Sequence, residues 1–568
     1  MRSSASPVVL SACLFAGLLA GGLRQPLLWT AVAAAIWLAA FHSPRLPRPG
    51  FLGPWAAWLA WSFLSMGACD QPWKCLFSVA RDATLVAFFC LAAVSWREED
   101  GPRWVWLLCA ASVALGLGTL FIKGTVHPRT GLIPPYYNYT VFVEAACAAS
   151  ALGAVGHAKR PRGWALAFLL GTAGFCLSMI LLARSRSGLV AVAAAGVVWA
   201  LRRGKIRPLL LAVAVSAGAW VLLPAPISSY LVKSDFSAWF TRPSIWRAAL
   251  QTAGDHPLLG EGPGNFQQGS LRHNFPKHWA TNYGFSADHA HSEVLEAAAE
   301  TGWPGLALLA AAVALAWRRR RPAASAWHRE AALAAWTAMT TQCLIDNMLH
   351  MPALGMLYFS SMVCAGAGRH DPSEPEGAPR PVWRRVCLAG FFLALSAWIP
   401  GWLVGRYTGL YETPGADPAW RAEVALSAAR IFPADASLRE NLARALLHTE
   451  PPQMERSLAE LDRASLLNPT NALYPMLSAE TVLAQGRPQE ALRLADRAIE
   501  LEPNYLAARL LRAELWARGG NKRAARRELR EVERRRGALD GMPLYSGYDR
   551  VIVFFDPERF AAASLRAR

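Results

Sequence analysis

Long apolar runs alternate with short polar segments over the first 404 residues of the chain. Each run holds about 15 to 21 residues, close to the roughly 20 residues that a helix needs to cross a bilayer core. This pattern predicts thirteen transmembrane helices, near residues 7–23, 27–41, 51–67, 78–95, 104–122, 139–156, 164–183, 187–201, 208–223, 303–317, 330–349, 353–367 and 386–404.

A different pattern begins at residue 412, where Arg, Glu, Ala and Leu replace the apolar runs. Pro433, Pro469 and Pro503 lie 36 and then 34 residues apart, with amphipathic stretches between them. A helix-turn-helix unit of 34 residues is the signature of tetratricopeptide repeats, which residues 485–503 resemble closely. Such repeats stack into a concave surface that docks other proteins. A domain that serves only as a stabilising cap is the alternative.

These two patterns together predict an all-α protein. We expect a polytopic membrane helix bundle of about 12 to 13 transmembrane helices, followed by a soluble α-solenoid of tetratricopeptide repeats. The expected division is a membrane domain, a cytoplasmic linker, a last transmembrane helix, the repeat domain and a C-terminal tail, at residues 1–366, 367–385, 386–404, 412–540 and 541–568.

Composition agrees with a membrane protein, because 54% of residues are hydrophobic and only 17% are charged. Typical soluble domains carry about 25% charged residues. The net charge of +18 lies mostly in short clusters between apolar runs, where topology signals are found. Because no basic and aromatic motif of a nucleic-acid binder appears, we expect no nucleic-acid partner.

The charged loops also predict the orientation of the chain. One set of alternate loops contains twenty Lys and Arg residues and the opposite set of short loops contains six. Cytoplasmic loops carry the excess of positive charge, so the first set is expected inside the cell. The N-terminus is then cytoplasmic, and an odd number of spans places the repeat domain on the periplasmic side of a bacterial inner membrane.

Cysteines are scattered, and no CxxC or zinc-ligand spacing occurs among the ten. Cys69 and Cys75 fall in a loop expected on the outer side, where an oxidising compartment permits a disulfide. Two unpaired thiols remain an equally good interpretation.

Arg184 and Arg186 flank a serine at an outer turn between two predicted spans. Paired guanidinium groups at such a turn suit a bidentate hold on phosphate oxygens. The alternative is that they anchor the helix ends at lipid head groups.

Residues 224–302 form the only large loop expected in the membrane part, and loops of this length are usually functional. Arg247 lies where an amphipathic helix would follow the membrane surface, and a lipid-anchoring cation is an equally good interpretation. The turn-rich sequence Leu259-Gly-Glu-Gly-Pro-Gly-Asn-Phe266 follows.

The end of this loop carries two histidines, His289 and His291. A helix that starts near His289 would align this histidine with Glu293, Glu296 and Glu300 and would end at Gly302. His291 would point elsewhere. A histidine general base is favoured over a metal site, because two histidines separated by one residue fit a helix poorly.

Weaker candidates lie nearer the N-terminus. Residues 129–138 include Arg129 and Asn138, and Glu144 follows within the next predicted span. Each of these residues could line the same cavity as the histidines. Arg81 and Asp82 are interpreted as a satisfied pair between helices.

These features, in this order, resemble the O-antigen ligase family of bacterial membrane glycosyltransferases over roughly residues 50–365. The most specific parts are Ser185-Arg-Ser-Gly-Leu189, Gly260-Glu-Gly-Pro-Gly-Asn-Phe266, His289-Ala-His-Ser-Glu-Val-Leu295 and Ala299-Glu-Thr-Gly-Trp-Pro-Gly305. The block at 129–138 is a weaker version of a family motif, with Tyr137 in place of a proline. Ser292 stands where the family usually has an asparagine.

The resemblance implies a GT-C-like enzyme that transfers a glycan from undecaprenyl diphosphate to an acceptor hydroxyl on the outer side of the inner membrane, without a cofactor or metal. Arg186 and Arg247 would hold the diphosphate, and His291 would activate the acceptor. Further substrate-binding candidates are Arg184, Arg129, Asn138, His289 and Glu300.

The family includes ligases, repeat-unit polymerases and protein O-oligosaccharyltransferases, so the acceptor is a glycolipid, a polysaccharide or a protein. The repeat domain would recruit a protein partner. Two classes without enzymatic activity remain: a lipid-glycan transporter, expected to show two related halves, and a membrane-anchored repeat scaffold.

Overall fold

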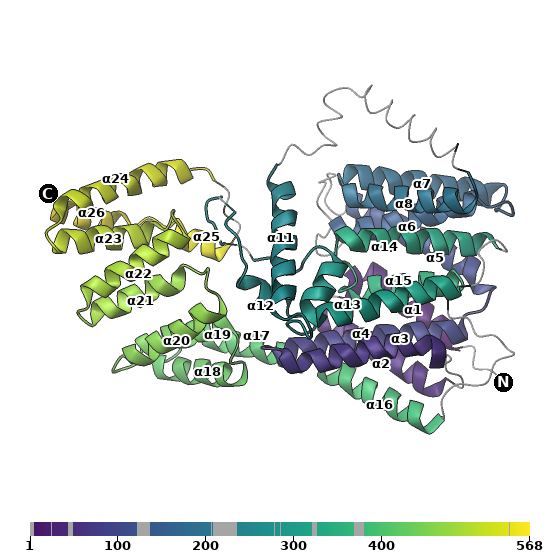
Figure 1. Ribbon diagram of the computed structural model, residues 1–568, viewed down its shortest axis with the longest axis horizontal. Helices are drawn as coiled ribbons and strands as arrows, with labels where there is room; N and C mark the ends of the chain where they lie inside the picture. The colour runs from purple at the N-terminus through teal and green to yellow at the C-terminus, as the bar shows by residue number, and fades with distance from the viewer. Residues whose placement is uncertain are drawn as a thin grey trace. The chain divides into compact units, whose positions relative to one another are not determined.

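The computed structural model describes residues 5–23, 25–43, 49–121, 137–205, 207, 236–277, 279–284, 286–320, 326–367, 380–542, 544 and 546–568. Every regular element in these ranges is helical, which confirms the predicted all-α class (Figure 1). The chain divides into two compact units, residues 1–264 with 289–398 and residues 265–288 with 399–568. Part of the long predicted loop therefore folds with the repeats.

Unit 1 is a bundle of apolar helices. Its elements are α1 (Ala5–Leu19), α2 (Pro26–His42), α3 (Pro49–Ser65), α4 (Pro72–Ser95), α5 (Asp100–Phe121), α6 (Tyr137–Val155), α7 (Trp164–Leu182), α8 (Arg186–Arg202), α11 (Phe236–Asp255), α13 (Glu293–Arg319), α14 (Trp327–Ile345), α15 (Pro352–Cys364) and α16 (Arg380–Ser396), with short 3₁₀ turns at Gly21–Leu23 and Met66–Ala68. The predicted apolar segments within the described ranges each overlap one of these helices, except that the segment at 386–404 extends beyond α16 into α17 (Ile399–Tyr411), which belongs to unit 2. The segment predicted at 208–223 lies outside the described ranges.

Five helices of the described part are long and apolar enough to cross a membrane: Pro72–Ser95, Asp100–Leu120, Trp164–Leu182, Glu293–Arg319 and Pro381–Tyr411. Shorter apolar helices occupy Pro7–Leu19, Pro26–His42, Tyr139–Val155 and Pro352–Cys364. The protein is therefore a multi-pass membrane protein.

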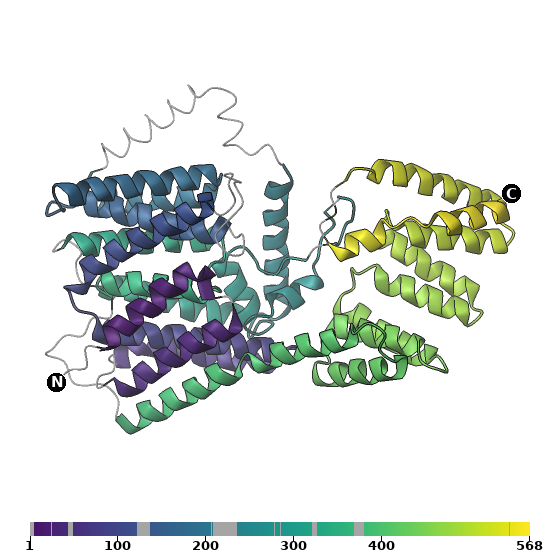
Figure 2. The ribbon, with the colours of Figure 1, turned by 180° about the vertical axis from the view of Figure 1, so that it is seen from behind.

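Small residues allow the central helices to approach closely. α6 is rich in alanine and packs along α14. The bundle that contains both helices is seen from behind in Figure 2. A Cβ on Gly153 of α6 would lie 2.9 Å from the Cβ of Ala334 and 3.0 Å from the carbonyl oxygen of Glu330. Membrane helices associate through such close packing because lipid tails are as apolar as the helix surfaces.

Polar side chains add specific links between these helices. The indole of Trp37 donates to the hydroxyl of Thr84 at 2.9 Å, and that of Trp104 donates to Ser360 at 3.0 Å. The Tyr139 hydroxyl donates to the carbonyl of Leu18 at 2.6 Å. Each bond joins two different helices, so it fixes their relative register in a core that has few other directional contacts.

Two helices of unit 1 depart from the bundle pattern. α11 lies across the ends of the bundle helices in Figure 1, consistent with the amphipathic surface helix predicted around Arg247. α13 breaks at Gly302, whose φ is 69°, just before Pro304. The indole of Trp61 donates to the carbonyl of Thr301 at 2.9 Å, next to the break. The predicted helix end at Gly302 is thus confirmed as a kink.

Unit 2 contains α12 (Phe266–Leu271), α17 (Ile399–Tyr411) and a row of helices that pack in antiparallel pairs (Figure 1). α18 (Pro418–Ile431) precedes the pairs α19 (Ala436–Leu447) with α20 (Met454–Leu467), α21 (Leu473–Ala484) with α22 (Pro488–Leu501), and α23 (Leu506–Arg518) with α24 (Lys522–Leu539). This is the predicted α-solenoid. The residues predicted as a tail form α25 (Gly547–Ile552) and α26 (Pro557–Ala567), and α26 covers the last pair.

The break in α13 leads to a test of stability. Gly302→Ala should lower the free energy of unfolding by about 2 kcal/mol or more, because the residue would adopt a positive φ and its Cβ would overlap the Leu258 carbonyl. Gly254→Ala in α11 is the control, since a Cβ there meets nothing within 4 Å. Thermal unfolding in detergent measures both. Equal melting temperatures for the two variants would contradict this account of the kink.

Candidate active site

The glycine-rich motif that follows α11 is a clamp on the first half of α13. The amide of Glu261 donates to the carbonyl of Ala299, and that of Gly262 donates to Glu300, both at 2.9 Å. Gly260 and Gly262 have φ values of 67° and 91°, which side chains other than glycine rarely adopt. A Cβ on Gly260 would also overlap the Glu300 backbone. The glycines of the motif are needed for this close backbone approach.

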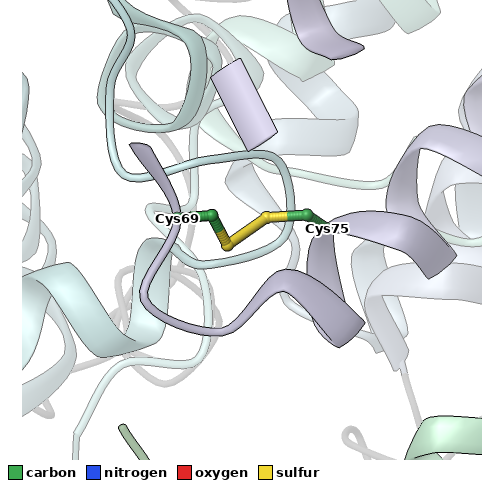
Figure 3. The surroundings of a disulfide bond; sticks show 2 residues. All are labelled: Cys69 and Cys75. Carbon is green, nitrogen blue, oxygen red and sulfur yellow. A yellow bond between two sulfur atoms is a disulfide. The ribbon is translucent and has the colours of Figure 1, made fainter. Parts of the chain in front are cut away.

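A disulfide joins Cys69 and Cys75 beside this clamp (Figure 3). A Cβ on Gly262 would lie 2.7 Å from the sulfur of Cys75. Of the two interpretations left open by the sequence, the structure shows the disulfide. The loop before α4, the glycine motif and α13 are thereby packed together within unit 1.

The two histidines lie in a turn ahead of α13. The prediction that the helix starts near His289 is wrong: α13 begins at Glu293, because the Ser292 hydroxyl caps it by accepting from the Leu295 amide at 3.4 Å. The turn nonetheless brings His289 to Glu296, with Nδ1 and Oε1 2.8 Å apart. The other oxygen of Glu296 accepts from the Ala290 amide at 2.9 Å.

His289 is held as a cation by this carboxylate. Burial alone would lower the pKa of His289, but the charge and hydrogen bond of Glu296 raise it from 6.5 to about 9. Its ring also stacks on that of His350, with centroids 4.1 Å apart. A group that stays protonated at neutral pH is poorly suited to act as a base, so this geometry gives His289 a structural or substrate-binding role.

His291 has a different environment. Its Nδ1 lies 3.4 Å from Oδ1 of Asp346, which follows α14 and is fully buried. The side chain of His291 is 35% exposed, so part of the ring remains accessible. Its φ of 50° is unusual for a residue with a side chain, and strain of this kind persists where surrounding contacts enforce it. One such contact is the indole of Trp246, which donates to the His291 carbonyl at 3.3 Å.

Asp346 also contacts Arg242 of α11. One guanidinium nitrogen lies 3.5 Å from Oδ2 of Asp346, and another donates to the Ile345 carbonyl at 2.9 Å. Arg247, on the same helix, has an exposed side chain. The structure therefore brings Arg242 and Asp346 to His291. Neither Arg242 nor Asp346 was among the predicted site residues.

Arg184 and Arg186 lie at the junction of α7 and α8. The Ser185 hydroxyl accepts from the Gly188 amide at 3.3 Å and caps α8, of which Arg186 is the first residue. Arg184 has a φ of 51°, which makes the turn tight. A helix N-terminus and guanidinium groups both attract anions. Arg129 lies outside the described residues, as does the side chain of Asn138.

A cavity of about 650 Å³ runs along α13. At one end it is lined by Arg81, Asp82 and three carboxylates, Glu293, Glu296 and Glu300. The rest of its wall is largely apolar, with Leu306, Leu309, Val313, Trp317, Trp336 and Phe359 among its residues. This places the predicted residue Glu300 at the polar end of a long apolar groove.

Two further candidates from the sequence have other surroundings. Arg81 and Asp82 form an ion pair at 2.8 Å, but they are neighbours within α4, so the predicted pairing between helices is wrong. Glu144 is fully buried in α6 and is not among the residues that line this cavity. Within the described residues, no group of three or more His, Cys, Asp or Glu side chains is arranged to hold a metal ion.

The fold and this site define a multi-pass membrane protein with a repeat domain. Residues 166–310 match the family described as O-antigen ligase, and residues 482–537 match a tetratricopeptide-repeat family. Both predicted resemblances are confirmed over these regions, and the first supports a glycosyltransferase or ligase role.

Comparison with other proteins adds little beyond these two families. None of the curated proteins matches the chain. Among solved structures, the chain is similar to the crystal structure of yeast Tom70, with 12% identity over 82% of this chain and 96% of that chain and a TM-score of 0.21. It is also similar to the APC/C hetero-tetramer Cut9-Hcn1, with 11% identity, coverage of 98% and 88%, and a TM-score of 0.24.

The raised pKa of His289 predicts how stability changes with pH. Because the pKa rises from 6.5 to about 9 on folding, the ion pair with Glu296 stabilises fully below 6.5 and is lost as pH increases through about 9. Thermal unfolding in detergent across this range should show a larger loss for the unmodified protein than for His289→Gln. His448→Gln, at an exposed histidine of the repeat domain, should behave like the unmodified protein. Parallel curves for the unmodified protein and His289→Gln would refute the ion pair.

Proposed function

We propose that the protein is a glycosyltransferase that moves a glycan from undecaprenyl diphosphate to an acceptor hydroxyl on the periplasmic side of the bacterial inner membrane. The observation that carries the proposal is the pairing of the half-exposed His291 with the buried Asp346. The O-antigen ligase match supports the reaction class.

His291 is the general base of this reaction. A carboxylate at Nδ1 favours the tautomer in which that nitrogen carries the proton, so Nε2 is left to accept the proton of the acceptor hydroxyl. The same carboxylate stabilises the imidazolium that forms as the hydroxyl attacks the anomeric carbon. Arg242 contacts the other oxygen of Asp346 and so helps to orient the carboxylate. Arg242 and Asp346 thus act through His291.

The arginines of the turn and the surface helix receive the diphosphate. Arg184 and Arg186 stand at the N-terminus of α8, and Arg247 projects from α11. Negative charge develops on the departing diphosphate as the glycosidic bond breaks, and guanidinium groups stabilise that charge. No metal is required in this scheme. Arg129 and Asn138 remain proposed substrate-binding residues.

The cavity suits the remaining parts of the substrates. Its apolar wall along α13 accommodates a hydrocarbon chain, whereas the carboxylates at its polar end accept hydrogen bonds from sugar hydroxyls. These carboxylates disfavour a diphosphate there, which agrees with placing the diphosphate at the arginines. Glu300 and His289 contribute to this sugar-binding end.

The proposed orientation rests on the charges of the loops, with the N-terminus in the cytoplasm and the repeats in the periplasm. The disulfide between Cys69 and Cys75 supports it, because that loop then faces an oxidising compartment. The repeat domain provides a surface for a protein partner.

Loss of the base should stop transfer while leaving the fold intact. His291→Ala should reduce turnover by about 100-fold to 10,000-fold, and the lipid-linked glycan should accumulate in cells, as measured by mass spectrometry of extracted lipids. His448→Ala is the matched control, because that exposed histidine lies on the repeat domain. If His291→Ala inserted normally and the lipid-linked glycan did not accumulate, the proposed reaction would be wrong.

Asp346→Asn should act through the histidine. We expect turnover to fall by about 100-fold or more, because the amide no longer favours the productive tautomer of His291, with little change in the KM for the donor. The dependence of turnover on pH should also shift. Asp100→Asn, whose parent carboxylate pairs with Arg103 in α5 and does not line the cavity, is the control for removing an acid from the same bundle. A loss confined to KM, with an unchanged pH profile, would argue against positioning of the base.

A further inference from the structure

Residues 265–288, here named the arm, connect α11 to the histidine turn but fold with the repeat domain. The arm is closed at its base, because the amide of Gln267 donates to the carboxylate of Asp288 at 2.6 Å. Near its tip, the Lys277 amide donates to the Asn282 carbonyl at 2.9 Å. These two bonds join the ends of the arm and close its tip within unit 2.

Glu502 is the centre of the contact between the arm and the repeats. This fully buried residue follows α22, and its carboxylate accepts from the amides of Asn282 and Tyr283, both at 2.6 Å. The Tyr548 hydroxyl also donates to it, at 3.2 Å. Burial raises the pKa of Glu502 although these donors act in the opposite direction. A buried carboxylate needs such partners, and separation of the arm would remove the two shortest of these bonds and leave the one from Tyr548.

Further contacts surround this carboxylate. The Thr281 hydroxyl donates to Asp549 at 2.8 Å, and the Asn282 side chain donates to the Leu501 carbonyl at 3.0 Å. The Asn504 side chain donates to the Ala280 carbonyl at 3.0 Å. The ring of Tyr283 packs on the apolar core of the repeats.

The arm also contacts the preceding turn between repeats, through two longer hydrogen bonds. Gln268 donates to the Leu467 carbonyl at 3.4 Å, and Asn274 donates to the Thr470 hydroxyl at 3.5 Å. The arm therefore lies along two successive turns between repeats, at 467–470 and 501–504. The proline motifs that set the repeat period also form its docking edge.

We propose that the repeat domain is a working part of the transferase, in which Glu502 is a positioning residue that holds the arm and thereby sets the histidine turn. This proposal rests on the proposed function. Asp288, the last residue of the arm, directly precedes His289 in the chain, and His291 follows two residues after His289. Because a tethered segment loses much of its conformational freedom, fixing the arm restricts the turn that follows.

The docking contact is tested by removing its central acceptor in the full-length protein. Glu502→Ala should speed hydrogen–deuterium exchange of the Asn282 and Tyr283 amides by about tenfold or more, since a lost acceptor exposes both donors. Exchange of residues 287–293 should also rise, and turnover should fall with little change in donor KM. Glu502→Gln keeps one acceptor oxygen, so its exchange rates and turnover should lie between those of the unmodified protein and those of Glu502→Ala. Glu500→Ala is the matched control, because that carboxylate is exposed and pairs only with Arg497 among the described residues.

A substitution on the arm itself tests whether the effects of Glu502→Ala come merely from unfolding of the repeats. Thr281→Val removes the bond to Asp549 without altering the solenoid, and it should shift exchange and turnover in the same direction as Glu502→Ala. Unchanged exchange at residues 282–283 would refute the docking. Faster exchange there with an unchanged turn at residues 287–293 and unchanged turnover would refute the positioning role. A different result would show that the proposed function itself is wrong: the His291→Ala variant would then turn over at the wild-type rate.

Discussion

A carboxylate buried in an apolar bundle must be paired, and this constraint on Asp346 organises the candidate site. The residue follows α14 with no exposed surface, and its two oxygens face His291 and Arg242. Removing one partner of a buried pair typically costs about 3–5 kcal/mol. The carboxylate therefore binds the histidine turn and α11 to the end of α14, and the exposed part of the imidazole is fixed as a consequence.

Backbone packing provides the second half of this arrangement. The glycine clamp holds the start of α13 through bonds to Ala299 and Glu300, and the kink at Gly302 redirects the helix into the bundle. Because Ser292 caps the helix, the residues before it are free to form a turn. Because the cap at Ser292 sets the start of the helix, the two histidines before it have different partners. His289 pairs with Glu296, and His291 faces Asp346.

Much of this fold could be predicted, because the spacing of hydrophobic residues and the charge of each loop depend only on residues close together in the sequence. The apolar segments and the proline spacing each depend on residues close in sequence, and the described helices agree with them. Asp346 could also have been found, since it is an acid within the segment predicted at 330–349, where such residues are costly. Arg242 was harder to separate from Arg247. The two lie five residues apart on one helix, and only packing decides which of them faces inward.

The arm shows what local patterns leave out. Its residues carry no period and no motif, so the sequence assigns it to one long loop, and its partners lie about 200 residues further along the chain. Backbone amides make the two shortest bonds to Glu502, and any sequence supplies amides. Such a contact becomes visible only once the turns between repeats are placed in space. A turn between repeats ordinarily only joins two helices. Here the turn also carries a buried acid, and the hydrogen bonds from the arm offset the free-energy cost of burying it. The repeats and the loop that leads to the histidines are consequently one folding unit.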